Sequence, residues 1–389
     1  MVLRDFEQSW ARCAGGLGCL AGLALVLTGC GQFFPPLSST GGGGTSSGDN
    51  IYIGNLGTST PTIAGITIAN SAVSAISGSD WDSSYSPNTM VVTQNDEYLF
   101  MGSDSGEILS FPIDSDGALG SGTAAASVIG SAMAIDTSGN WLIVADLSGD
   151  VYAYGLDSSN GTLTSPLSSG TAAMSGCVPT TNLAGGTPGI VVAPGDNYIY
   201  VTCGTAGVYT FSFDSSSGDL ASVNSTLTPK QSGDADYGIA IAPSGDYLYV
   251  AETGIGALRV FSISSSNGTL SETTSLGSPY KTATGAYGVL VDSTGSYVYV
   301  TNRTQGTISG FSIGSTGALT ALSGSPFATG TLPQTIVEDK SDTYIAVACA
   351  GGSPDLEIYT IGTTGALTEF KSETTGTDPT QATSLAVTH

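Results

Sequence analysis

A repeated pattern of about 49 residues constrains this chain more than any other feature of its sequence. Residues 238–261 (GIAIAPSGDYLYVAETGIGALRVF) and residues 288–311 (GVLVDSTGSYVYVTNRTQGTISGF) align without a gap. Further copies begin near Met90, Ala132, Gly189 and Thr335. Each copy holds a short apolar run, a polar turn and two runs in which apolar and polar residues alternate. Alternation with a period of two predicts β-strands and excludes a helical repeat.

A tight-turn signal follows the second alternating run of several copies. Asn160-Gly161 and Asn267-Gly268 are Asn-Gly pairs, and Gly317 and Gly365 stand at the matching places in later copies. Glycine and asparagine tolerate the positive backbone angle that a two-residue hairpin requires. A short fourth strand after this turn completes the unit. Four antiparallel strands recurring at this spacing are typical of a β-propeller blade.

The number of blades follows from the start of the second strand in each copy. This position holds an aromatic residue in the following set: Tyr98, Trp141, Tyr198, Tyr247, Tyr297 and Tyr344. Residues 50–55 supply a further second strand that lacks its own first strand, and residues 384–387 supply a first strand without the rest of a blade. Pairing these two fragments removes both exposed edges. The sequence therefore predicts an all-β domain over residues 49–389, a seven-bladed β-propeller of four-stranded antiparallel blades, closed by pairing of the C-terminal strand with the N-terminal blade.

The first residues differ from the repeat and predict an export signal. Arg4 and Arg12 precede an apolar run over residues 14–27, which is short for a membrane span. The run ends in Leu-Thr-Gly-Cys30, which resembles the bacterial lipobox, where a peptidase cuts before a cysteine that carries lipid. A short membrane anchor or an ordinary secretory signal is the alternative. We predict a lipoprotein signal peptide over residues 1–29, lipidation at Cys30, and a flexible Gly/Ser-rich tether to residue 48.

The predicted export signal determines the expected compartment of the mature protein and the redox state of its remaining cysteines. We expect the propeller to be lipid-anchored in a bacterial cell envelope and to face outside the cytoplasm. Gly31, in place of an aspartate after the cysteine, favours the outer membrane over the inner one. In an oxidising compartment Cys177 and Cys203 can form a disulfide, which would leave Cys349 unpaired.

Composition excludes several classes of function. The chain has 8 basic and 32 acidic side chains and a formal charge of -24, which argues against binding nucleic acid or a phosphorylated substrate. Its one histidine is the last residue, His389. The sequence therefore argues against a catalytic histidine base, a histidine metal cluster and a Ser–His pair. We expect a monomer that has no metal and no cofactor.

One family resembles the repeat closely. Tyr299-Val300-Thr301-Asn302 matches the tetrapeptide of the YVTN repeat, and residues 249–252 and 200–203 are variants of it. With PSGDYLYV before such a strand and FSI with GTL after it, residues from about 50 to 389 resemble the seven-bladed lactonase family, which includes 6-phosphogluconolactonase and muconate-lactonising enzymes. The resemblance implies a propeller and, in the family's enzymes, catalytic signatures similar to G-P-R-H and N-E. These fall on residues 235–238 (ADYG) and 251–252 (AE), so only Glu252 is retained.

A candidate ligand site follows from the geometry of a blade. Two strands return the chain to its starting end, so residues after each second strand and before each first strand should lie together around the central channel. The mouth of such a channel is a common place for a ligand. The predicted polar ring comprises Asn55, Ser103, Asp146, Tyr237, Glu252, Tyr287, Asn302, Arg303 and Gln334.

Individual members of this ring admit two interpretations each. Glu252 could act as a general base with a raised pKa, but we favour a carboxylate that accepts backbone N–H groups at a loop, because no partner acid is evident. Tyr237 and Tyr287 either stack on a sugar or aromatic ligand or pack between blades. Arg303 either orients a ligand carboxylate or is an exposed loop side chain. Asp146 and Glu252 lie two blades apart, so we expect no shared cation between them.

Two functions from different classes remain. The first is a binding or scaffold module that presents the channel mouth to a glycan, a peptide or a protein partner. The second is a lactonase that hydrolyses an extracellular sugar or aromatic lactone, with Glu252 as its base. The sequence favours the first, because the basic side chains of the family's catalytic signatures are replaced.

Overall fold

The structure, a computed structural model, describes residues 48–56, 60–174, 177, 189–226, 235–352, 354–373 and 382–389. All of them belong to one compact unit. The predicted signal peptide over residues 1–29, the lipidation site Cys30 and the tether that follows lie outside these residues, apart from the last tether residue, Gly48. Within the described ranges, no helix is both long and apolar enough to cross a membrane.

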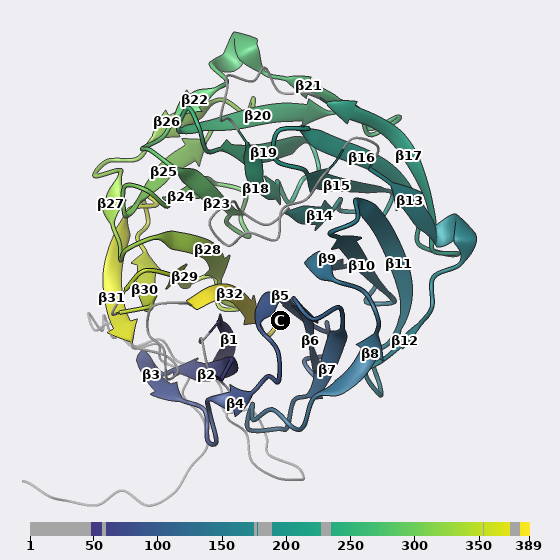
Figure 1. The fold of residues 1–389 in the computed structure, drawn as a ribbon. Coiled ribbons are helices and arrows are strands. Elements are labelled where there is room, and N and C mark those ends of the chain that lie inside the picture. The colour runs from purple at the N-terminus through teal and green to yellow at the C-terminus, as the bar shows by residue number, and fades with distance from the viewer. Residues whose placement is uncertain are drawn as a thin grey trace, which may run out of the picture. The chain divides into compact units, whose positions relative to one another are not determined.

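Seven antiparallel sheets form the blades of a propeller (Figure 1). Each innermost strand contacts the innermost strands of both neighbouring blades, so the ring is closed. The innermost strands are β32 (Ala382–Val387), β5 (Pro87–Val92), β9 (Gly130–Ile135), β14 (Ile190–Val192), β18 (Asp236–Ile241), β23 (Ala286–Val291) and β28 (Pro333–Glu338). The predicted seven-bladed β-propeller is confirmed.

The other strands follow outward in chain order, as Figure 1 shows. The second strands are β1 (Asp49–Asn55), β6 (Tyr98–Ser103), β10 (Trp141–Asp146), β15 (Tyr198–Thr202), β19 (Tyr247–Glu252), β24 (Tyr297–Asn302) and β29 (Tyr344–Cys349). The third strands are β2 (Thr62–Ala69), β7 (Ile108–Pro112), β11 (Asp150–Asp157), β16 (Val208–Asp214), β20 (Ala257–Ile263), β25 (Thr307–Ile313) and β30 (Leu356–Ile361). The fourth strands are β3 (Ala72–Ala75), β8 (Thr123–Ala126), β12 (Thr162–Thr164), β17 (Asp219–Thr226), β21 (Leu270–Glu272), β26 (Leu319–Ala321) and β31 (Leu367–Glu373).

Within the described ranges, four blades carry a short extra strand that the repeat did not predict. These strands are β4 (Trp81–Asp82), β13 (Thr171–Ala173), β22 (Tyr280–Lys281) and β27 (Phe327–Ala328). Each pairs with the part of the third strand that the short fourth strand leaves open; in one blade, for example, β12 covers the end of β11 and β13 covers its start. The extra strands therefore satisfy backbone groups at the outer edge. Two short 3₁₀ helices, η1 (Ser168–Gly170) and η2 (Thr274–Leu276), precede two of them.

The two ends of the repeat join as predicted. Strand β32 pairs antiparallel with β1, so that Ile51 lies opposite Val387 and Ile53 lies opposite Leu385. The Asn50 backbone N–H then donates to the Thr388 hydroxyl at 3.0 Å. The first blade thus takes its innermost strand from the far end of the chain, and this pairing closes the ring.

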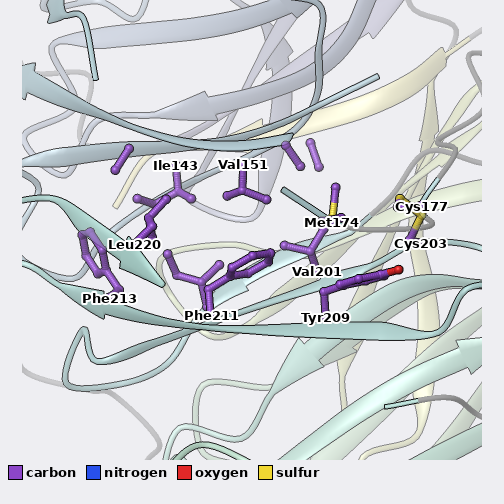
Figure 2. Close-up of a cluster of buried hydrophobic side chains, with 14 residues drawn as sticks. Ile143, Val151, Met174, Cys177, Val201, Cys203, Tyr209, Phe211, Phe213 and Leu220 are labelled. Carbon is purple, nitrogen blue, oxygen red and sulfur yellow. A yellow bond between two sulfur atoms is a disulfide. The ribbon is translucent and has the colours of Figure 1, made fainter. Parts of the chain in front are cut away.

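Apolar side chains fill the space between neighbouring blades. Figure 2 shows one such cluster, in which Ile143 and Val151 of one blade face Val201 and Phe211 of the next. All four side chains are fully buried, and each contributes roughly 1.5–3 kcal/mol by leaving water. The disulfide between Cys177 and Cys203 lies at one end of this cluster. Cys349 is buried and forms no disulfide with the other cysteines that the structure describes.

Tyrosines of the second strands contact the hairpin turn of the next blade. The Tyr200 hydroxyl donates to the Gly268 carbonyl at 3.0 Å, and the Tyr299 hydroxyl donates to the Gly365 carbonyl at 2.8 Å. A Cβ atom on Gly268 would lie 2.4 Å from the Tyr198 ring, and its φ is +70°. Glycine is required there for two reasons, close approach and the left-handed backbone.

Candidate functional site

A cavity of about 210 Å³ lies at the centre of the ring and is lined by the innermost strands. Three successive positions of these strands form three layers. The rim is polar and comprises Asn88, Ser131, Tyr237, Tyr287, Gln334 and Thr383. The middle layer is small and comprises Thr89, Ala132, Gly189, Gly238, Gly288, Thr335 and Ser384. The floor is apolar and comprises Met90, Met133, Ile190, Ile239, Val289, Ile336 and Leu385.

The charge of this wall is as informative as its shape. Among the described residues that line the cavity, none carries a charged side chain. Leu147, in the turn after β10, is the one described lining residue that does not belong to these layers. The cavity therefore offers hydrogen-bonding groups and aromatic rings at its rim, and no fixed charge along its described wall.

A β-bulge places the rim side chains. In the six blades whose rim residue the structure describes, the pairing between first and second strand shifts at that residue. In one blade, for example, Tyr287 and Gly288 together lie opposite the single residue Thr301. A bulge bends the strand and redirects its extra side chain. The rim residues are therefore released from the alternation that governs the rest of the strand.

The small middle layer lets adjacent innermost strands approach closely. A Cβ atom on Gly288 would lie 2.2 Å from the carbonyl oxygen of Gln334, and one on Gly238 would lie 2.0 Å from that of Tyr287. The Thr301 hydroxyl joins the same two strands, since it accepts the Gly288 N–H at 2.7 Å and donates to the Gln334 carbonyl at 2.9 Å. The rim positions of neighbouring blades are thus fixed relative to one another.

Two tyrosines form an aromatic face on the rim. The rings of Tyr237 and Tyr287 lie 5.5 Å apart at an angle of 33°, and both side chains are half-buried. The Arg303 guanidinium lies 5.8 Å from the centre of the Tyr287 ring, a cation–π distance. Burial, with a contribution from Tyr287, raises the pKa of Tyr237, while Arg303 opposes the shift. At neutral pH the Tyr237 phenol is therefore a hydrogen-bond donor.

The residues that end the second strands lie elsewhere. Asn55, Ser103 and Asp146 do not line the cavity; all are buried within their blades. Asp146 accepts the backbone N–H groups of Ser148 and Asp150, at 2.9 and 2.8 Å, and so closes the turn between β10 and β11. The Ser103 hydroxyl likewise donates to the Glu107 carbonyl at 2.7 Å, at the turn between β6 and β7, so both side chains point into their blades. The predicted ring therefore separates into a rim set that includes Tyr237, Tyr287 and Gln334, and a buried set.

Asn302 and Glu252 belong to the buried set. Asn302 donates to the hydroxyls of Thr307 and Ser309, at 3.1 and 2.9 Å. The Glu252 carboxylate is fully buried and accepts the Nε–H of Arg259 at 2.5 Å. Arg259 also binds Glu272 at 2.8 Å. Burial lowers the pKa of Arg259, but its hydrogen bonds and charge interactions with the two glutamates outweigh burial, so the net effect is a raised pKa. The guanidinium therefore stays charged.

Sequence reasoning missed Arg259, although a signal was present. It is the one charged residue in the apolar strand β20, ALRVFSI. A buried arginine needs a partner carboxylate, because desolvating an unpaired charge is costly. Strand β20 lies beside β19, which ends at Glu252, so the partner could have been found by asking which nearby strand supplies an acid. Glu252 thus forms an ion pair with the cationic Arg259, and it is not among the residues that line the cavity.

Comparison with known proteins now assigns the family. A family model described as lactonase, 7-bladed beta-propeller, matches residues 50–384. The chain belongs to this family of seven-bladed β-propeller lactonases. Among curated proteins, none has a sequence that matches this chain.

Solved structures share the fold of this lactonase-family propeller at low identity. The periplasmic gluconolactonase of Pseudomonas aeruginosa is 17% identical, with a TM-score of 0.69 over 88% of this chain and 99% of its own. A Bacteroides fragilis protein provisionally assigned as a 6-phosphogluconolactonase is 17% identical, with a TM-score of 0.71 over 90% of this chain and 100% of its own. A Lactobacillus plantarum protein is 17% identical, with a TM-score of 0.69 over 88% of this chain and 100% of its own.

Other potential reactive groups in the lactonase-family propeller lie apart from the cavity. Burial is the main cause that raises the pKa of the Cys349 thiol, to about 12, so it is not an activated thiolate. In the part of the chain that the structure describes, no group of three or more His, Cys, Asp and Glu side chains could hold a metal ion. The cavity and its neutral rim are therefore the candidate functional site.

Proposed function

We propose that this lactonase-family propeller binds a small, neutral, hydroxylated ligand, of the saccharide class, in the central cavity. The observation that carries the proposal is the rim that the bulges create. Amide, hydroxyl and phenol groups surround the mouth of the cavity there, and none of the described lining residues is charged. The cavity volume of about 210 Å³ lies below the roughly 300–1,000 Å³ typical of drug-sized ligands. A monosaccharide-sized ligand therefore suits it better than a peptide or a protein segment.

The rim offers two kinds of contact to such a ligand. The paired rings of Tyr237 and Tyr287 present an aromatic face, on which the C–H face of a sugar ring can pack. The amides of Asn88 and Gln334 supply both donors and acceptors on the same rim. The apolar floor lies beneath the ligand and excludes water from these hydrogen bonds, which strengthens them.

Hydrolysis of a neutral lactone is the second candidate. It is favoured by the family and by a fold neighbour named as a gluconolactonase. A sugar lactone is neutral and hydroxylated, so it fits the same cavity, and the protonated Tyr237 phenol could donate to its carbonyl oxygen. Glu252 is bound to Arg259 inside its blade and does not line the cavity. We therefore rank hydrolysis through Glu252 below ligand binding.

Calorimetric titration of the full chain tests both candidates. We expect neutral monosaccharides to bind, and we expect Tyr287→Ala to weaken binding roughly tenfold, because an aromatic contact contributes about 0.5–1.5 kcal/mol beyond area burial. The matched control is Tyr85→Ala, which removes an exposed tyrosine that does not line the cavity. Absence of binding across neutral monosaccharides and their lactones would contradict the proposal.

A parallel assay separates the two candidates. Proton release from sugar δ-lactones, followed by pH-stat, detects hydrolysis directly. Turnover that is lost in Glu252→Gln with the fold intact would reverse our ranking and assign the base to Glu252. Saccharide binding without turnover supports the binding module.

We also propose that the propeller acts outside the cytoplasm, anchored by lipid on Cys30. The apolar run ending in Leu-Thr-Gly-Cys supports this, as does the Cys177–Cys203 disulfide, a bond favoured in oxidising compartments. A fold neighbour named as periplasmic agrees. Incorporation of labelled palmitate that Cys30→Ala abolishes would support the anchor, and an unlabelled chain in the cytosol would contradict it. Separation of the two membranes then tests the expected outer-membrane location.

A further inference from the structure

The disulfide links two neighbouring blades. Cys177 lies after β13, and its backbone N–H donates to the Met174 carbonyl at 2.9 Å; the Met174 N–H in turn donates to the Gly149 carbonyl at 2.7 Å, in the turn before β11. Cys203 lies directly after β15 of the next blade. Both cysteines are buried, at one end of the apolar cluster in Figure 2. Neither lines the cavity, so the bond can act on a ligand only through the residues that it holds.

The residues on both sides of Cys203 hold the backbone of Tyr237 in the following blade. The Thr202 hydroxyl donates to the Tyr237 carbonyl at 2.6 Å. Gly204 and Asp236 exchange two backbone hydrogen bonds, each of 3.0 Å. Because Asp236 directly precedes Tyr237, the segment around Cys203 fixes the point from which this rim tyrosine projects.

The contact between Gly204 and Asp236 has a different form from the equivalent contact in later blades. Thr253 and Arg303 stand at the position of Gly204 in those blades, and their backbone N–H groups donate to carbonyls of their own blades, at 3.0 and 2.7 Å. Gly204 pairs instead with the next blade, and among the described residues this is the one isolated β-bridge that joins two blades. The segment that supports Tyr237 is in turn attached by the disulfide to the blade before it.

We propose that the Cys177–Cys203 disulfide positions Tyr237 on the rim, so that the propeller binds its saccharide with full affinity only when this bond is formed. The inference rests on the proposed function, because Tyr237 supplies half of the aromatic face for that ligand. Cys203 is a positioning residue, since it acts through its neighbours and not by contact with the ligand. Without the bond, the ligand must order Tyr237 on binding, and ordering a contact residue reduces affinity.

Calorimetry on the full chain tests the inference, with D-glucose, D-galactose and their δ-lactones as probes. Cys177→Ala removes the bond and should weaken binding roughly fivefold. Dithiothreitol should weaken binding by the folded wild type equally, as it is oxidised to its cyclic disulfide and both cysteines become thiols. The Cys177→Ala variant should not respond to dithiothreitol. The matched control is Cys349→Ala, at the position of Cys203 in another blade, which should bind as the wild type does.

Removing Tyr237 distinguishes positioning from a general loss of stability. Added to Tyr237→Ala, Cys177→Ala should change affinity less than about twofold, because the side chain through which the bond acts is gone. Added to Gln334→Ala, on another part of the rim, it should again cost roughly fivefold. Equal losses in the two backgrounds, or unchanged affinity of the single Cys177→Ala variant, would overturn the inference.

Hydrogen exchange tests the positioning without any ligand. The amides of Gly204 and Asp236 bond to each other's carbonyls and should exchange faster in Cys177→Ala than in the wild type. The Arg303 amide, which bonds within its own blade, should exchange at the wild-type rate. Unchanged exchange at Gly204 and Asp236 would overturn the positioning role. If no probe binds the wild type, the proposed function fails, while the exchange rates still decide whether the disulfide holds the Tyr237 segment.

Discussion

Two sets of polar side chains lie at the same end of the blades, but only one of them lines the cavity. The rim set, with Tyr237, Tyr287 and Gln334, belongs to first strands that contain a bulge, and it lines the cavity. The buried set, with Asp146 and Glu252, ends second strands that lead into tight turns, and it lies inside the blades. Both sets satisfy the same topological rule. The difference shows that local backbone geometry, rather than position in the repeat, decides which residues can meet a ligand.

The two sets also differ in charge. The buried set includes carboxylates whose hydrogen bonds come from their own blade, such as the Asp146 turn and the Glu252–Arg259 pair. The rim set is neutral and owes its arrangement to contacts between blades, such as the Thr301 bridge to Gln334. Changes in the buried set should therefore affect stability first, whereas changes in the rim set should affect binding first.

The largest expected effect comes from breaking the buried pair. Arg259→Met removes the guanidinium that neutralises the fully buried Glu252 carboxylate and should lower the free energy of unfolding by about 3–5 kcal/mol. Denaturant titration measures this loss. The double variant Glu252→Leu/Arg259→Met removes both charges and should recover most of it. Affinity for a cavity ligand should be unchanged in the folded protein, and loss of binding at unchanged stability would place the pair in the site.

A substitution in the small middle layer, which lets the innermost strands approach, should reduce both stability and binding. Gly288→Ala places a Cβ atom 2.2 Å from the Gln334 carbonyl oxygen, and backbone cannot move as a flexible side chain can. We expect a loss of about 1–3 kcal/mol in unfolding free energy and weaker saccharide binding, since the rim residues Tyr287 and Gln334 must separate.

Gly314→Ala is the matched control for that substitution. The nearest atom to a Cβ there is the Ala318 carbonyl oxygen at 3.2 Å, in a hairpin away from the cavity. Stability and affinity should remain close to those of the wild type. Equal effects of the two substitutions would show that close packing at Gly288 does not position the rim.

The blades themselves could be predicted because their signals are local. Alternation along residues such as 247–250 marks a strand, and Asn267-Gly268 marks the turn of its hairpin; both features act over a few residues. Ring closure was also predictable, since the lone strand at 50–55 lacks a first strand and residues 384–387 provide one. Each of these predictions depends on pairing rules that a repeat displays several times.

The site was only partly predictable because it departs from those rules. A bulge adds one residue, and one residue is enough to move a side chain from the blade face to the cavity, as at Tyr287. No residue type marks these bulges, since their rim residues include Asn88, Thr383 and Tyr237. The short strands β4, β13, β22 and β27 were missed for a related reason, because they pair where a neighbouring strand happens to end. Where a pattern is broken rather than repeated, coordinates are needed.

The smallest expected effect is a pH dependence that separates the two ends of one strand. Strand β28 carries neutral Gln334 at the cavity and Glu338 at its other end. Burial, together with the charges of Asp292, Asp342 and Asp339, raises the pKa of Glu338 to about 7, although a backbone hydrogen bond from Ser293 opposes this. The carboxyl thus holds its proton more tightly in the folded state than in the unfolded state. Its contribution to stability is complete below about pH 4.5 and is lost as the pH rises through about 7.

Glu338→Gln should therefore flatten the fall in unfolding free energy between about pH 4.5 and 7, by a modest amount because the side chain is half-exposed. Glu369→Gln, at an exposed position of β31, is the control and should leave the slope as it is. Saccharide affinity, measured by calorimetry over the same range, should stay constant, since the described cavity wall has no charged side chain. If affinity instead followed the stability curve and lost its pH dependence in Glu338→Gln, the two ends of β28 would be coupled, and the separation between a neutral binding rim and the titrating remainder of the blade would be wrong.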